Sequence, residues 1–321
     1  MAGEFDIIQR YFRFPQGQGV VLGPGDDCAL LAPEPGQQLA VTSDVLVEGV
    51  HFPEEAAPDC IGYKALAVNL SDLAAQGAEP LWVTLGLTLP HAEEAWLAGF
   101  AGGLRRLLER HHVSLVGGDT TRGPLAIAVT ALGQVPPDAV LRRSGASPGD
   151  LICVSGTVGD AGLALMALQG EVSLPADAWQ QVAPRLHAPE PRVALGLALR
   201  GVASACIDIS DGLLADLGHL LDASAVGAVL RLEAVPFSAP VRQWLDAGGD
   251  PLRLLSAGDD YELLFTLPPE REARLSALAE TAGVALTVIG EVQQGTGIRL
   301  FTPSGEAVRV KPLGYDHFGN D

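Results

Sequence analysis

Segments with strand-like and helix-like hydrophobic patterns alternate along this chain of 321 residues, and this alternation limits the fold more than any other feature. β-branched residues and leucine dominate residues 38–52 and 81–90, and we expect a strand that runs into a loop in the first stretch and a strand in the second. Alanine and leucine dominate residues 61–76 and 93–112, where we expect helices. The pattern is typical of an α/β (α+β) fold in which helices cover sheets.

The stretch RRSGASPGD, residues 142–150, interrupts this alternation with glycine, serine and proline. Such a composition is typical of a linker, and we place a domain boundary inside it. The sequence therefore predicts an N-terminal α/β domain, residues 1–142, and a C-terminal α/β domain, residues 143–321. In the second domain, residues 151–168 and 205–224 each predict a strand, a glycine turn and a helix.

The balance of charge excludes several classes of partner. Asp and Glu number 39 against 20 Lys and Arg, and the formal net charge is −19. A chain of this sign repels nucleic acid and anionic membrane surfaces. No segment is long and apolar enough to span a membrane, and the N-terminus has no apolar signal core. The four cysteines are scattered, which favours free buried thiols, so we expect a soluble cytoplasmic protein.

Aspartates gather where the expected strands or helices meet glycine-rich loops. They are Asp26, Asp27, Asp44, Asp72, Asp119, Asp208, Asp211, Asp259 and Asp260. One aspartate in a loop usually forms a turn or caps a helix. That explanation weakens when separate segments share the arrangement, because carboxylate oxygens are the ligands that Mg²⁺ prefers and phosphates replace the waters that Mg²⁺ retains. The pattern favours magnesium and a polyphosphate, and solvated turns remain the alternative.

The chain has no phosphate loop of the G-x-x-x-x-G-K-[ST] type, so a bound phosphate needs another cradle. VGGDTTRG, residues 116–123, is one candidate. Its Gly117 and Gly118 allow close approach of a phosphate to the backbone, and Asp119 can take a metal. The turn of a β-hairpin explains the same glycines equally well. Arg143 is either a fork for phosphate oxygens or a solvated linker residue.

IDISDG, residues 207–212, places two more carboxylates close together. If the strand ends at Ile209, Asp208 and Asp211 both face the following loop. Ser210 either caps the next helix or donates a hydrogen bond to a ligand.

Several short strings occur in one order and together resemble the thiamine-monophosphate kinase family. They are GEFDII (3–8), GDDCALL (25–31), TSDVLVEGVHF (42–52), NLSDLAAQGAEP (69–80), VGGDTTRG (116–123), RSGASPGD (143–150), ISDGL (209–213), GDDYELLF (258–265) and GYDHF (314–318). Some of them also suit the wider superfamily of aminoimidazole ribonucleotide synthetase, selenophosphate synthetase and a hydrogenase maturation factor. The strings at 42–52 and 314–318 favour the kinases, and the resemblance covers nearly the whole chain.

The resemblance implies that the γ-phosphoryl group of ATP passes directly and in line to the phosphate of thiamine monophosphate, without a phosphoenzyme. It implies several Mg²⁺ ions in place of a catalytic side chain. It also implies a homodimer in which the N-terminal domains pair their strands, and a C-terminal domain that folds over ATP with the site in the cleft between the domains.

The family pattern also implies three sets of site residues. Metal positions are Asp27, Thr42, Ser43, Asp44, Asp72, Asp119, Asp208 and Asp211. ATP positions are Gly118, Asp119, Arg143 and Ser210. Substrate positions are His51, Asp259 and Tyr315, and a shift of the alignment by one residue makes Asp260 and Glu262 further candidates. From the residues alone, His51 is a loop histidine packed beside Phe52. Tyr315 stands where the family often has Trp, and either ring can stack on a cationic heterocycle.

Two other functions fit parts of the pattern. A ligase-type member of the superfamily would use ATP to activate a carbonyl oxygen, and its substrate pocket would lack an aromatic residue near the C-terminus. A non-catalytic acidic metal-binding protein would show no nucleotide turnover. Release of ADP in the presence of thiamine monophosphate, Mg²⁺ and ATP separates the three functions.

Overall fold

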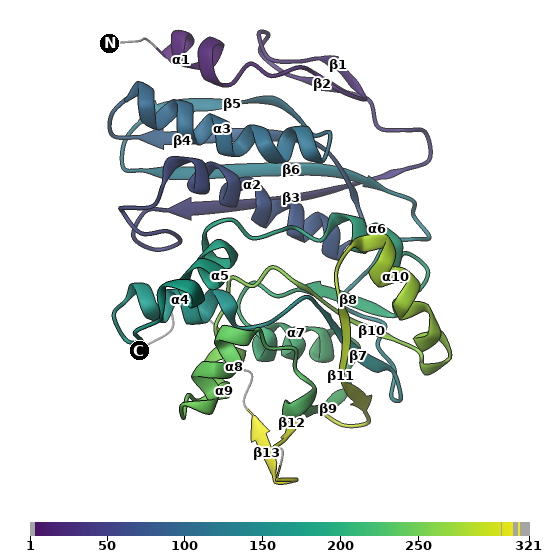
Figure 1. Ribbon diagram of the computed structural model, residues 1–321. Coiled ribbons are helices and arrows are strands. Elements are labelled where there is room, and N and C mark those ends of the chain that lie inside the picture. Colours follow the sequence, from purple (N-terminus) through teal and green to yellow (C-terminus); the bar gives the residue numbers. More distant parts are fainter. Residues whose placement is uncertain (1–3, 303, 311–313, 315–321) are drawn as a thin grey trace. The chain divides into compact units, whose positions relative to one another are not determined.

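The computed structural model describes residues 4–302, 304–310 and 314. The chain divides into two compact units, which we call the N-terminal unit (Met1–Leu73 with Ala78–Ala139) and the C-terminal unit (Ala74–Gly77 with Val140–Asp321). Each unit combines a sheet with helices (Figure 1), so the expected α/β class is confirmed. Within the described ranges, no helix has the length and apolar character needed to cross a membrane.

The N-terminal unit is a four-stranded sheet with helices against one face. Its elements are α1 Glu4–Tyr11, β1 Val20–Leu22, β2 Leu30–Leu31, β3 Gln38–Val47, α2 Pro58–Ala75, β4 Glu79–Leu89, α3 Glu94–Arg110, β5 Ser114–Arg122 and β6 Ala126–Val135. The strand order is β3-β6-β4-β5, with β4 and β5 parallel and the other pairs antiparallel. α2 and α3 lie side by side against this sheet (Figure 1).

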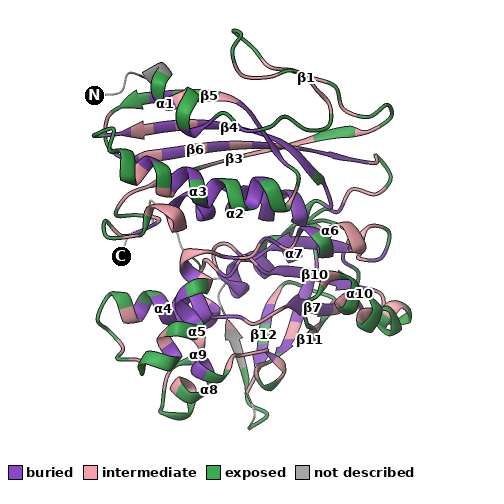
Figure 2. Ribbon diagram, turned by 45° about the horizontal axis from the view of Figure 1, so that its top comes forward, coloured by how far each residue is buried: buried purple, intermediate pink, exposed green. Residues whose placement is uncertain are grey.

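Side chains of β3 alternate between the two faces of the sheet, because successive residues of a strand point in opposite directions. Leu39, Val41 and Val45 are 49%, 61% and 53% exposed, whereas Leu46 is 3% exposed. Buried residues concentrate on β4 and β6, along nearly all of α2, and on part of α3 (Figure 2). The face of β3 that carries Leu39, Val41 and Val45 therefore leaves aliphatic side chains in solvent.

Gly117 and Gly118 do not form the turn of a hairpin. They lie inside β5, and the chain bends later, at residues 123–125. Moreover, β4 lies between β5 and β6 in the sheet, so β5 and β6 are not neighbours and cannot form a hairpin. The hairpin interpretation is wrong because the presence of glycines says nothing about which strand lies alongside.

The C-terminal unit is a seven-stranded sheet with helices packed on it. Its strands are β7 Leu151–Ser155, β8 Ala205–Asp208, β9 Gly227–Arg231, β10 Leu263–Leu267, β11 Leu286–Gln293, β12 Gly297–Phe301 and β13 Ala307–Val310. Its helices are α4 Asp160–Leu168, α5 Ala176–His187, α6 Val193–Leu199, α7 Leu213–Ser224, α8 Ala239–Asp246, α9 Pro251–Leu255 and α10 Leu275–Ala282, with 3₁₀ turns η1 Leu232–Ala234 and η2 Pro269–Arg274.

The strand order of this sheet is β13-β12-β9-β11-β7-β10-β8, and among its described strands only β9 and β12 pair in parallel. Leucines of α7 pack on Ile152, Ile207 and Leu264 of the strands in one core. α4, α5, α8 and α9 share a second apolar cluster. The strand-turn-helix order expected for residues 151–168 and 205–224 is confirmed as β7 with α4 and β8 with α7.

All four cysteines are free, but only two of them are buried. Cys153 and Cys206 lie in β7 and β8, whereas Cys28 is exposed and Cys60 is partly exposed. The expectation of buried thiols is therefore wrong for Cys28 and Cys60. Burial raises the pKa of the Cys153 thiol to about 12. It raises the pKa of Cys206 as well.

Candidate functional site

A pocket of about 600 Å³ lies within the N-terminal unit. Its walls come from α1, from the loop between β1 and β2, and from β4 and β5. Three residues expected at metal or ATP positions, Asp27, Gly118 and Asp119, surround this one cavity. Phe12 adds apolar surface and Arg13 adds a cationic group. The volume lies in the range of cavities that hold small-molecule ligands and cofactors.

Gly118 shapes the strand that forms one wall of this pocket. Its φ is +146°, and a Cβ at this position would lie 1.9 Å from the carbonyl oxygen of Leu85 in β4. Only glycine adopts this backbone shape so close to another strand. The packing against β4 therefore requires this glycine, and the approach of its backbone to a phosphate stays a prediction. The next residue, Asp119, is exposed at the pocket.

A second group of candidates joins β3 to α2. The hydroxyl of Thr42 donates a hydrogen bond to Asp72 Oδ2. The backbone N–H of Asp44 donates to Asn69 Oδ1 at 3.2 Å, and Asn69 Nδ2 in turn donates to the carbonyl of Ala65 at 3.0 Å. The Thr42 contact places its side chain on the face of the sheet that α2 covers. Asp44, two residues further along β3, lies on the same face because side chains of a strand alternate.

Ser43 lies between these two residues but faces the other way. Its hydroxyl is 2.9 Å from Thr130 Oγ1 and donates to the carbonyl of Val129 at 3.2 Å. Both residues lie within β3, in the stretch where a strand was expected, and neighbouring side chains of a strand alternate between its two faces. The structure therefore groups Thr42 with Asp72, and the Ser43 hydroxyl does not join them.

In the C-terminal unit, Asp216 organises the loop between β8 and α7. One oxygen of its carboxylate accepts hydrogen bonds from the backbone N–H groups of Ser210, Asp211 and Gly212, at 3.0, 3.0 and 3.1 Å. Of the two alternatives for Ser210, the helix cap is not found, because the N-cap of α7 is Gly212 and no side chain bonds there. Asp216 reaches back from the first turn of the helix to the loop before it. Burial raises the pKa of Asp216 to about 7, although these N–H groups act in the opposite direction.

Asp208 and Asp211 have different surroundings. β8 ends at Asp208, one residue earlier than expected, and Asp208 is only 3% exposed. Asp211 lies in the loop and is half-buried. Asp211 is therefore more accessible to solvent than Asp208.

Residues 258–262, GDDYE, form a second loop, since β10 begins only at Leu263. Asp259 and Tyr261 both have positive φ, +70° and +47°, which non-glycine residues rarely adopt. The N–H of Asp259 donates to the carbonyl of Ser210 at 2.9 Å, and the N–H of Tyr261 donates to the carbonyl of Ile209 at 2.8 Å. The loop carrying Asp259 is thus bonded to the loop carrying Ser210.

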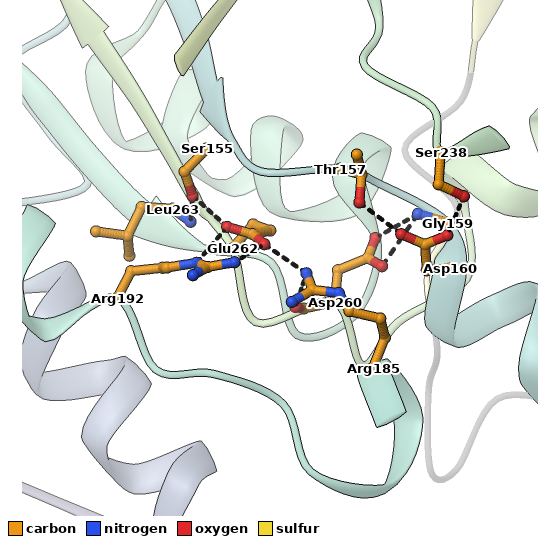
Figure 3. A network of polar contacts seen from close by, with 10 residues as sticks. All are labelled: Ser155, Thr157, Gly159, Asp160, Arg185, Arg192, Ser238, Asp260, Glu262 and Leu263. Carbon is orange, nitrogen blue, oxygen red and sulfur yellow. Dashed lines mark hydrogen bonds and ion pairs between the residues drawn. The ribbon is translucent and has the colours of Figure 1, made fainter. Parts of the chain in front are cut away.

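Asp260 is held away from solvent. It is 0% exposed, and both of its carboxylate oxygens accept the N–H of Gly159, at 3.0 and 2.9 Å (Figure 3). Burial raises the pKa of Asp260 well above its ordinary value. Asp260 therefore bonds to the residue that precedes α4, which does not favour it as a substrate contact.

Glu262 is also 0% exposed and lies between two arginines (Figure 3). Arg192 donates to both carboxylate oxygens, through Nε at 2.7 Å and through Nη2 at 2.5 Å. Arg185 donates to Oε1, and Ser155 donates to Oε2 at 2.5 Å. Asp259, which is half-buried, is the most accessible carboxylate of this string.

The other ATP and substrate candidates lie at turns and loops. Arg143 is exposed, and its carbonyl accepts a hydrogen bond from the Ser224 hydroxyl at 3.2 Å. His51 Nδ1 accepts the N–H of Val47 at 3.0 Å, and its carbonyl accepts from Lys64 at 3.2 Å. This geometry makes one ring nitrogen of His51 part of the turn that follows β3.

Tyr315 lies outside the described residues. Its neighbour Gly314 is described, and a Cβ at Gly314 would lie 2.9 Å from the carbonyl oxygen of Asp211. The GYDHF string therefore begins beside the loop that Asp216 organises.

The candidate metal residues offer oxygen atoms of carboxylates, hydroxyls and the backbone, and oxygen is the donor that Mg²⁺ prefers. Across residues 4–302, 304–310 and 314, no three His, Cys, Asp or Glu side chains come together as a ready-made ion site. The N-terminal unit contains Asp27, Thr42, Ser43, Asp44, Asp72 and Asp119, and the C-terminal unit contains Asp208 and Asp211. The donor chemistry fits magnesium, and each metal position stays a prediction.

The sequence interpretation missed Asp216, Arg185 and Arg192. An acidic residue in the first turn of a helix is a recognised signal, so Asp216 could have been found. No local pattern marks the arginines, because they pair with Glu262 at separations of 77 and 70 residues.

Two family models match the chain, and together they identify the class of protein. Residues 25–135 match the family model of the N-terminal domain of AIR synthase related proteins, and residues 147–302 match that of the C-terminal domain. The two α/β units carry these two matches, so the fold and the sequence define the same class.

Closer relatives narrow the class. The thiamine-monophosphate kinase of Salmonella typhimurium strain LT2 is 45% identical, over 98% of both chains. The crystal structure of the thiamine-monophosphate kinase from Stenotrophomonas maltophilia K279a is 46% identical and covers 91% of this chain and 93% of its own, with a TM-score of 0.84. The structure of AaThiL complexed with AMPPCP and TMP is 33% identical and covers 89% of both chains, with a TM-score of 0.79. The chain belongs to the thiamine-monophosphate kinase family and is an enzyme of the phosphotransferase class.

Proposed function

We propose that this protein transfers the γ-phosphoryl group of ATP to the phosphate of thiamine monophosphate, giving thiamine diphosphate and ADP. The observation that carries the proposal is the pocket of about 600 Å³, where Asp27, Gly118 and Asp119 surround one cavity in a chain of this family. The AaThiL complex with AMPPCP and TMP supports ATP and thiamine monophosphate as the two substrates.

The acceptor phosphate is already ionised near neutral pH, so the reaction requires no strong general base. The main obstacle is the repulsion between two phosphorylated molecules, and catalysis rests on positioning and on compensation of charge. Transfer is direct and in line. Magnesium ions, when bound, supply positive charge between the phosphates.

The chain's own groups divide these tasks. Arg143 offers a planar fork to phosphate oxygens. Ser210 offers a hydroxyl from a loop whose backbone Asp216 holds in place. Asp259 offers a negative charge to the cationic thiamine, and His51 and Tyr315 are the further substrate contacts.

We assign the metal positions to oxygen donors in both units. They are Asp27, Thr42, Ser43, Asp44, Asp72, Asp119, Asp208 and Asp211. In this proposal Ser43 contributes a backbone oxygen, because its hydroxyl lies on the opposite face of β3 from Thr42. The hydrogen bond from Thr42 to Asp72 supports placing these two residues at one ion.

The test is ADP release by the purified protein with ATP, Mg²⁺ and thiamine monophosphate, together with chromatographic detection of thiamine diphosphate. We expect both products in equal amounts. ADP release that depends instead on a carbonyl-containing acceptor would replace the kinase by a ligase-type activity. Absence of turnover with any acceptor would leave a metal-binding protein.

We also propose that the protein is a cytoplasmic homodimer. The solvent-exposed face of β3 with Leu39, Val41 and Val45 supports pairing between N-terminal units, because exposed aliphatic clusters on a sheet mark contact surfaces. The four free cysteines fit a reducing compartment.

A further inference from the structure

The loop from Gly258 to Tyr261 is held in an unusual backbone shape. Asp259 and Tyr261 both lie in the left-handed region, and neither is glycine. Non-glycine residues keep this conformation only where the surrounding structure imposes it. The loop therefore depends on the groups that fix its two ends.

Hydrogen bonds fix the loop on the side of the Ser210 loop. The N–H groups of Asp259 and Tyr261 donate to the carbonyls of Ser210 and Ile209. The N–H of Ile209 donates back to the carbonyl of Glu262 at 2.9 Å. These bonds fix the backbone on both sides of Asp260.

Glu262 fixes the other end through its side chain. Its carboxylate receives the two-pronged contact from Arg192, the contact from Arg185 and the hydroxyl of Ser155 (Figure 3). Arg185 also donates to the carbonyl of Asp260 at 3.4 Å, so it contacts the loop itself. The side chains of Arg185 and Arg192 are 19% and 16% exposed and that of Glu262 is 0% exposed, so these ion pairs are largely out of water.

Stability alone does not account for this cluster. Buried ion pairs contribute little compared with apolar packing of the same volume, whereas they do define one geometry. We propose that Glu262, through Arg185 and Arg192, is a positioning residue that holds the Gly258–Tyr261 backbone so that Asp259 meets the acceptor substrate. The role for Asp259 rests on the proposed function, whereas the holding of the loop does not.

The test variant is Glu262→Gln, which keeps the size of the side chain and removes its charge. We expect hydrogen exchange at the amides of Asp259 and Tyr261 to accelerate by about tenfold or more, while the amides of β7 stay protected. The matched control is Glu171→Gln, which removes the same charge from a solvent-exposed ion pair with Arg253. It should leave the exchange at Asp259 and Tyr261 unchanged.

Kinetics separate positioning from general stability. Glu262→Gln should lower kcat/KM for thiamine monophosphate by about tenfold to a hundredfold while the KM for ATP moves by less than about threefold, because Asp216 still holds the Ser210 loop. Asp259→Asn should show a similar loss, and the double variant should be little worse than either single one. Independent, multiplying losses in the double variant would overturn the proposal.

If Glu262→Gln does not fold, Arg192→Lys serves instead, since it keeps the charge and removes the two-pronged contact. Unchanged amide exchange in a folded variant refutes the holding of the loop, whatever the activity. A different outcome is faster amide exchange in Glu262→Gln together with no phosphorylation of thiamine monophosphate by the unsubstituted protein. That outcome would refute the proposed function and the role of Asp259, and it would support the loop-holding role of Glu262.

Discussion

Thr42 in β3 donates a hydrogen bond to the carboxylate of Asp72 in α2, a residue 30 positions further along the chain. Asp44, two residues after Thr42, lies on the same face of the strand, where its N–H bonds to Asn69 of α2. The packing of one helix on one strand thus gathers oxygen donors from two distant segments.

We expect Asp44→Asn to abolish at least about 99% of the turnover, because an amide is a weaker ligand for Mg²⁺ than a carboxylate. The measurement is ADP release with thiamine monophosphate across a magnesium titration, accompanied by a melting curve. Asp138→Asn on an exposed loop of the same unit is the control and should behave like the unsubstituted protein. Near-normal turnover in Asp44→Asn would exclude the metal role of Asp44.

Arg143→Ala should raise the KM for ATP by about tenfold, since a charged fork contributes about 1.5–3 kcal/mol to a phosphate contact. Arg142→Ala is a matched control, because its side chain is also exposed and the carbonyl that bonds to Cys206 remains. Initial rates at varied ATP provide the comparison. An identical dependence on ATP in both variants would show that Arg143 does not contact the nucleotide.

Gly118→Ala should destabilise the N-terminal unit by at least about 3 kcal/mol, because a Cβ 1.9 Å from the carbonyl of Leu85 forces β4 and β5 apart. The control is Gly102→Ala in α3, where no atom lies within 4 Å of the added Cβ. That substitution should be neutral or stabilising by about 0.5–1 kcal/mol. Chemical denaturation measures both, and a small loss at Gly118 would contradict the described strand packing.

A thiol reagent at about pH 8 should modify Cys28 rapidly and Cys60 slowly in the native protein. Cys153 and Cys206 should stay unmodified, because raised pKa values keep them as neutral thiols and the thiolate is the reactive form. Raising the pH to about 10 should leave Cys153 largely un-ionised, because burial raises the pKa of its thiol to about 12. Mass spectrometry of peptides identifies the sites, and denaturant should make all four thiols react. Native labelling of Cys153 at the rate of Cys28 would contradict its burial.

If β3 forms the proposed dimer contact, Val41→Asp should yield a monomer, because a charge in the centre of an aliphatic contact is left without water or a partner. Light scattering coupled to gel filtration reports the mass. Val21→Asp is the control, since Val21 is also exposed, at 69%, but lies in β1, which pairs with β2 outside the four-stranded sheet. A dimer that survives Val41→Asp would place the interface elsewhere.

Periodic segments of the chain were predictable from the sequence because their pattern is local. Residues 61–76 were expected as a helix and the structure has α2 at Pro58–Ala75, and the strand-turn-helix order of residues 151–168 is as expected. The pairing of strands was not predictable in the same way. The glycines at 117 and 118 fit a hairpin, yet β5 pairs with β4 and not with β6.

The sequence by itself determined the class of the fold, the family and the positions of the aspartates, since hydrophobic period, composition and short strings are properties of neighbouring residues. Only the tertiary structure decided what each carboxylate does. Asp260 and Glu262 are carboxylates of the same short string as Asp259. Both are buried, however, and Asp260 bonds to Gly159 whereas Glu262 pairs with two arginines. Desolvation and long-range pairing are set by which segments pack together, and no local pattern contains that information.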